Sequence, residues 1–141
     1  MAVNFHFEDI KRFPFKIRFH KTWIKVISQS YSKTLGDVNV IFCSDDYLLK
    51  MNNDFLSHDY YTDVITFDYC DGNLVSGDIF ISIDRVYENA RINDVPYSVE
   101  LQRVIIHGFL HLVGFQDSSN ILKEKMTAAE NLALASLHTV K

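Results

Sequence analysis

The sequence has 141 residues, of which 48% are hydrophobic, and a formal net charge of −4 at pH 7. This length predicts a single domain, residues 1–141, with enough apolar side chains for a hydrophobic core. Cys43 and Cys70 match no metal-binding spacing, and no segment has the length of a membrane span or the pattern of a secretory signal. We therefore expect a cytoplasmic protein that needs neither a disulfide nor a membrane.

In chain order, the spacing of apolar residues predicts an alternation of strands and helices. Alternating apolar residues indicate strands, whereas apolar residues three or four apart indicate helices. The expected elements are a strand over residues 3–7, a helix over about 16–33, a strand over 38–43, a short helix through about 53, strands over 64–69 and 77–83, and helices that end near 92, 113 and 137. We predict an α+β fold in which a small mixed sheet of about four strands packs against helices.

Short polar or glycine-containing stretches are expected to end these elements. Leu35 and Gly36 should stop the first long helix, and residues 70–73 should form a hairpin-type connection. Asp84 is the expected N-cap of the helix that follows the last strand. Ser98 should cap the next helix, and the stretch Ser118-Ser119-Asn120 should cap the final one.

The charge is distributed unevenly along the chain. Residues 10–36 contain seven basic residues and no acid, so the remainder of the chain is strongly acidic. This distribution is expected of a protein that meets phosphate groups at one surface. An ordinary solvated helix face accounts for it equally well.

His58, in a later loop, is a candidate metal or RNA contact, although a loop histidine is more often ordinary surface.

The helix expected to end near residue 113 carries two histidines at helical spacing. His107 and His111 are four residues apart, so both imidazoles should lie on one face and can share a metal ion. Gly114 can end the helix, and Asp117 then offers a carboxylate. Three protein ligands are typical of catalytic zinc, which leaves its fourth position to water or substrate. A lone histidine pair is more often part of a core, but the glycine and acid favour a site for zinc or another divalent ion.

Zinc peptidases share this spacing, but their helix has the pattern H-E-x-x-H. Gly108 stands where those enzymes need a glutamate as general base, which disfavours a peptidase. The glycine predicts open space beside the ion, suited to a bulky substrate such as a nucleic-acid strand. Arg103, one turn before His107, is a candidate catalytic residue that contacts a phosphate. A salt bridge from Arg103 to Glu100 or another acid is the alternative.

The stretch from His107 to Phe115, H-G-x-L-H-L-x-G-F, resembles the signature of the YbeY family of endoribonucleases. Further matches to the family occur in the expected order at Asn52, Thr62 to Phe67, Gly77-Asp78-Ile79, and Met126 with Glu130. The resemblance implies a metal-dependent endoribonuclease that acts on single-stranded RNA in rRNA maturation and ribosome quality control. It implies rRNA and the ribosome or its precursors as partners.

The chain departs from the family pattern at two positions. The third ligand is usually a histidine in the family, whereas this chain has Asp117, whose carboxylate can also bind a metal. An arginine usually follows the aromatic residue after the asparagine element, but here Leu56 follows Phe55. Two alternatives to the endoribonuclease therefore stay open. They are a zinc metallopeptidase-like hydrolase and a non-catalytic ribosome-assembly factor with a structural metal.

Overall fold

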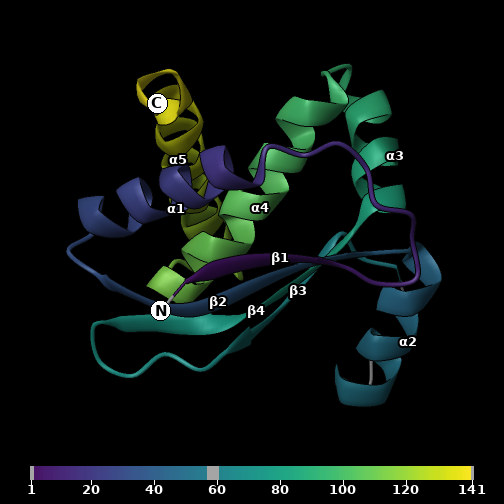
Figure 1. Cartoon of the computed structure of the whole chain (residues 1–141), viewed down its shortest axis with the longest axis horizontal. Helices are drawn as coiled ribbons and strands as arrows, with labels where there is room; N and C mark the ends of the chain where they lie inside the picture. The colour runs from purple at the N-terminus through teal and green to yellow at the C-terminus, as the bar shows by residue number, and fades with distance from the viewer. Residues whose placement is uncertain (1, 57–60, 141) are drawn as a thin grey trace.

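The computed structural model describes residues 2–56 and 61–140 (Figure 1). Its elements are β1 (Val3–Phe7), α1 (Ile17–Ser30), β2 (Thr34–Cys43), α2 (Asp45–Leu56), β3 (Val64–Asp68), β4 (Leu74–Ser82), α3 (Ile83–Asn93), α4 (Tyr97–Val113), α5 (Asn120–Ala135) and the 3₁₀ helix η1 (Ser136–Thr139). Within these two ranges, no helix is long and apolar enough to cross a membrane.

Across the described residues, four strands form one mixed sheet in the order β1-β2-β4-β3. β1 pairs in parallel with β2, and β2 in parallel with β4. β3 is antiparallel to β4 because the two strands are joined by the predicted hairpin, closed by a bridge between Asp71 and Leu74. The predicted α+β class with a small mixed sheet is therefore confirmed.

Helix α4 lies at the centre of the helical layer, as predicted. It contacts the sheet at β3 and β4 and contacts helices α1, α3 and α5 on its other sides (Figure 1). The main core consists of fully buried side chains from this helix, the central strands and α1, among them Ile105, Ile106, Phe109, Leu110, Val40, Phe42, Ile79, Ile81, Trp23 and Ile24. Because α4 is buried nearly all round, its few polar side chains are held in fixed surroundings.

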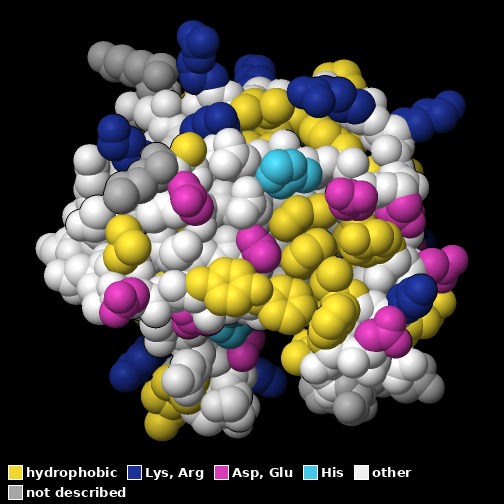
Figure 2. Space-filling model, turned by 60° about the horizontal axis from the view of Figure 1, so that its bottom comes forward, with side chains coloured by type: hydrophobic (Ala, Val, Ile, Leu, Met, Phe, Trp, Pro, Cys, Tyr) yellow, Lys and Arg dark blue, Asp and Glu magenta, His cyan; other side chains and the backbone are white. Residues whose placement is uncertain are grey.

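The opposite face of the sheet is covered only in part, by α2. A second, smaller core of Cys43, Leu48 and Ile65 lies there. Phe67 and Phe80 pack edge to face at 5.8 Å beside this cluster and remain partly exposed. Figure 2 shows hydrophobic side chains gathered on the molecular face turned forward in that view, with acidic side chains around them and most of the visible Lys and Arg along the upper margin.

Two predicted element boundaries are wrong, the first because of long-range pairing and the second because of a local hydrogen bond. β2 begins at Thr34, so Leu35 and Gly36 lie inside a strand, because Thr34 and Leu35 pair with Leu74 and Val75 of β4. Ser82 rather than Asp84 caps α3, since the Ser82 hydroxyl accepts a hydrogen bond of 3.2 Å from the Arg85 N–H.

Of the other two predicted helix caps, one is wrong and one is confirmed. Helix α4 begins at Tyr97 behind Pro96, with no side-chain cap, so the prediction that Ser98 caps it is wrong. Proline suits such a position because it carries no N–H donor and its φ is fixed. Ser119 caps α5 as predicted, accepting a hydrogen bond of 3.2 Å from the Leu122 N–H.

Candidate metal centre

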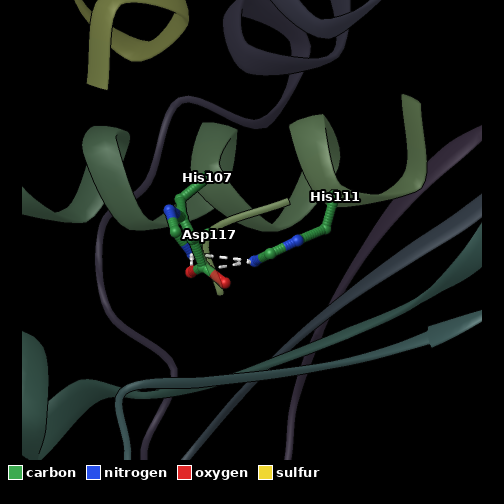
Figure 3. Close-up of side chains that lie close together, drawn as sticks. All are labelled: His107, His111 and Asp117. Atoms are coloured by element: carbon green, nitrogen blue, oxygen red, sulfur yellow. Dashed lines mark hydrogen bonds and ion pairs between the residues drawn. The ribbon is translucent and has the colours of Figure 1, made fainter. Parts of the chain in front are cut away.

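Three side chains predicted as metal ligands converge beside α4 (Figure 3). His107 Nε2 and His111 Nε2 are 3.0 Å apart, and each is 3.4 Å from Asp117 Oδ2. Atoms bound tetrahedrally at about 2.0–2.1 Å from a zinc ion lie roughly 3.3 Å from one another. The three donors are therefore spaced as ligands of one ion, and the Asp117 side chain, 42% exposed, lies open to solvent.

The end of α4 brings Asp117 back towards the two histidines. Gly114 has a φ of 126°, a conformation that glycine adopts without strain, and its N–H bonds to the carbonyls of Leu110 and His111. The Phe115 N–H also bonds to the Leu110 carbonyl, at 3.0 Å, which closes the turn. The predicted stop at Gly114 is confirmed, and the turn it makes sets where the third donor lies.

Hydrogen bonds to the two Nδ1 atoms fix which ring nitrogen of each histidine is available. His111 Nδ1 lies 3.0 Å from the Phe115 carbonyl, which can only accept, so Nδ1 carries the hydrogen. His107 Nδ1 lies 2.6 Å from Glu130 Oε2 and donates to that carboxylate. In the neutral rings, both Nε2 lone pairs therefore face each other across 3.0 Å. Such a pair repels unless a proton or a metal cation lies between them, and with Asp117 Oδ2 3.4 Å from both nitrogens the residues present fit a divalent ion.

Glu130, buried on α5, organises the charges behind the site. Burial would raise the pKa of its carboxyl, but hydrogen bonds from His107 and Arg103 outweigh burial and lower it. Burial would likewise lower the pKa of His107, but its hydrogen bond to Glu130 and the carboxylates around it raise it. Glu130 is therefore an ionised carboxylate that orients His107, the usual arrangement behind a metal-bound histidine.

Arg103 is held by groups on α5. Its guanidinium donates to Glu130 Oε1 at 2.7 Å and to Asn131 Oδ1 at 2.8 Å. The salt bridge considered for Arg103 therefore exists, and its acid is Glu130 rather than Glu100. A phosphate contact by Arg103 stays a prediction. The geometry allows it, because the side chain is 33% exposed and these two bonds do not use all the N–H donors of the guanidinium.

Gly108 packs against the sheet rather than facing a space beside the ion. A Cβ atom at this position would lie 2.6 Å from Ile79 Cγ2 and 3.4 Å from Val64 Cγ2. The prediction of open space at Gly108 is therefore wrong for this position. One residue along a helix turns the side chain by about 100°, which carries position 108 away from the ligand face and onto β4.

Two acids behind the site, Asp63 and Glu100, were not predicted from the sequence to belong to it. Asp63 accepts a hydrogen bond of 3.2 Å from Asn89, and burial raises its pKa although the charge of His107 opposes this. Burial, and then the charge of Asp63, raise the pKa of Glu100. The position of Glu130 did carry a signal, because it is the one acid in the buried stripe of α5, with Met126, Ala129 and Ala133.

His58 lies outside the described residues. Leu56, which stands where the family usually has arginine, is the last residue of α2 and is exposed.

Comparison with known proteins assigns the family. The family model described as endoribonuclease YbeY matches residues 6–138. Proteins named endoribonuclease YbeY from Bacteroides fragilis and Bacteroides thetaiotaomicron are 49% and 50% identical, each over 135 residues, covering 96% of this chain and 97% and 98% of their own. The solution structure of TM1509 from Thermotoga maritima has a TM-score of 0.64 at 27% identity, over 97% of this chain and 92% of that one. The chain belongs to the YbeY family of endoribonucleases.

Proposed function

We propose that this protein is a single-strand-specific, metal-dependent endoribonuclease of the cytoplasm that acts in rRNA maturation and ribosome quality control. The observation that carries the proposal is the convergence of His107 Nε2, His111 Nε2 and Asp117 Oδ2 at 3.0–3.4 Å, in a chain of an endoribonuclease family. We assign these three residues as ligands of one divalent ion, with zinc as the first candidate. The proposed partners are single-stranded rRNA and the ribosome or its precursors.

In the proposed reaction, the residues around the site orient the two histidines and supply positive charge near the substrate. A bound divalent ion would polarise a phosphate oxygen and make a coordinated water more acidic. Glu130 holds His107 in one tautomer, and the Phe115 carbonyl holds His111, so both rings present Nε2 without rearrangement. We further assign Arg103 as a catalytic residue, whose positive charge offsets charge that develops on the phosphate.

The test compares RNA and protein substrates under controlled metal content. Purified protein is incubated with a single-stranded RNA, with the same RNA as a duplex, and with an unfolded protein, each with and without chelator. We expect cleavage of the single strand only, lost on chelation and restored by a divalent ion. Cleavage of the unfolded protein would instead identify a peptidase. Metal binding without any cleavage would identify the assembly factor.

Matched variants locate the activity. We expect His111→Ala to lose both bound metal and RNA cleavage. His138→Ala removes an exposed histidine of η1 and should change neither. Equal metal content in the two variants, measured on the purified proteins, would remove His111 from the ligand set.

A further inference from the structure

A cavity of about 420 Å³ lies on the side of α4 away from the metal centre. Its walls come from the β1–α1 connection, the start of α1 and the start of α4, and Figure 1 shows this connection passing over the beginning of α4. At about 100° per residue, Leu101 and Gln102 in its wall lie roughly 120–140° around the helix from His107. The volume falls in the range of small-molecule sites, about 300–1,000 Å³.

Aromatic rings form much of the wall. Phe15 stacks on His20 with ring centres 4.3 Å apart and planes 17° apart. Phe19 meets His20 edge to face at 5.2 Å, and Phe13 meets Phe15 edge to face at 6.2 Å. Phe13, Phe15, Phe19 and Tyr97 are each only partly buried. Partly exposed rings of this kind provide stacking surfaces for a planar heterocycle such as a nucleobase.

A polar pair in the wall offers both a donor and an acceptor. His20, 5% exposed, donates from Nδ1 to the Lys16 carbonyl at 2.7 Å, so its Nε2 accepts from the Gln102 amide at 3.1 Å. Burial lowers the pKa of His20, which keeps this arrangement neutral. Among the described residues, the second amide hydrogen and the oxygen of Gln102 have no partner. A base edge presents the complementary acceptor and donor.

Among the described residues that line the cavity, the one with a formal charge is basic. Lys16 lines it and is exposed, and it belongs to the acid-free run of residues 10–36. Helices α1 and α4 both begin at this cavity, and neither N-terminus has a side-chain cap. The positive end of α1, whose first turn contains no acid, adds to the charge of Lys16 and favours an anionic group there, whereas Glu100 in the first turn of α4 offsets part of the positive end of that helix.

We propose that this cavity binds a nucleotide, with the base among the rings and the phosphate beside Lys16. The same chemistry is offered by a free mononucleotide and by one nucleotide of a single-stranded RNA. The cavity is distinct from the metal centre, so nucleotide binding does not require the ion.

Equilibrium dialysis of the full chain with labelled AMP, in the presence of chelator, measures the affinity. Trp23 is the one tryptophan of the chain, and its ring lies 6.2 Å from that of His20, so its fluorescence reports binding at the cavity. We expect saturable AMP binding that changes this fluorescence. Adenosine, which lacks the phosphate, and ribose 5-phosphate, which lacks the base, should each bind more weakly.

Three variants test the assignment. Lys16→Gln and Phe19→Leu should each weaken AMP binding about tenfold, the loss of one charge-assisted contact or one stacked ring. Lys25→Gln, nine residues along α1 and on its opposite side, should leave the affinity unchanged. Phe19 lies outside the main core, so thermal unfolding should show both cavity variants folded. No saturable AMP binding, or equal affinity in all three variants, overturns the proposal.

A single-stranded oligoribonucleotide in competition with AMP identifies the source. Displacement of AMP by the oligonucleotide, weakened by Lys16→Gln, assigns the cavity to the RNA strand. AMP binding that the oligonucleotide does not disturb assigns it to a free nucleotide. His107→Ala separates this proposal from the proposed function, because it should abolish RNA cleavage and leave AMP binding intact.

Discussion

Glu130 joins two residues of α4 through its two carboxylate oxygens. One oxygen accepts from His107 at 2.6 Å and the other from Arg103 at 2.7 Å. Glu130→Gln removes the charge that orients His107, so we expect zinc affinity to fall by about 10–100-fold while the fold is retained. Zinc titration against a competing chelator measures this. Glu124→Gln, on the exposed side of the same helix, is the control and should bind zinc as the parent does.

The role proposed for Arg103 is either a direct contact with a phosphate of RNA or the positioning of Glu130, and the salt dependence of RNA binding separates the two. A direct phosphate contact releases counterions, so Arg103→Gln should reduce the slope of log affinity for RNA against log salt by about one. Glu130→Gln should leave that slope unchanged. A slope that Arg103→Gln does not alter would restrict Arg103 to positioning Glu130.

Gly108 sets how closely α4 approaches β4. Because an added Cβ would lie 2.6 Å from Ile79 Cγ2, we expect Gly108→Ala to lower the free energy of unfolding by about 1–3 kcal/mol, despite alanine's better helix propensity. Urea unfolding measures the loss. In a double-mutant cycle with Ile79→Ala, which removes Cγ2, the added cost of Gly108→Ala should shrink. Strict additivity would place the strain elsewhere.

At the scale of elements, Asp45 links the start of α2 to the start of α3. It accepts hydrogen bonds from Ser82 at 2.7 Å and from Arg85 at 2.8 Å. Burial would raise the pKa of Asp45, but these bonds lower it below its ordinary value of 3.8. A carboxyl whose pKa is lower in the folded state adds stability above its unfolded pKa, and this stability is lost as pH falls through the folded pKa.

Asp45→Asn should therefore lower the free energy of unfolding at pH 7 by about 1–2 kcal/mol. The difference from the parent should shrink as pH falls below 3.8, the ordinary value for this carboxyl. Urea unfolding at a series of pH values measures it. Asp46→Asn, at the exposed neighbouring position, is the control, and a loss that does not depend on pH would refute the electrostatic account.

The elements themselves could be predicted from the sequence because their signals are local. The spacing of His107 and His111 and the glycine after them were enough to anticipate that these histidines and Asp117 would cluster. Features that depend on a partner distant in sequence could not be anticipated. Gly36 was predicted to end a helix, but it lies in a strand that pairs with β4. Gly108 was predicted to leave open space, but Ile79 packs against it.

At the scale of the whole molecule, the candidate metal centre lies beside the core and is not part of it. His107, His111 and Asp117 are only partly buried, whereas the main core of α1, β2, β4 and α4 is complete without them. We expect the metal-free protein to fold and an ion at 100 times its dissociation constant to add about 2.7 kcal/mol. Asp117→Ala should keep the metal-free melting temperature and lose this increment. Thermal unfolding with and without metal measures both, and a variant that keeps the increment would show that Asp117 is not a ligand.

The third donor stands outside the helix that carries the other two. His107 and His111 are fixed relative to each other by α4, whereas Asp117 follows the turn at Gly114 on a tether of three residues. An ion held by the two histidines alone would meet Asp117 at an effective concentration in the millimolar range or above, as short tethers give. If the three residues hold an ion as proposed, we expect its release to begin at Asp117, and lengthening this tether should speed metal exchange.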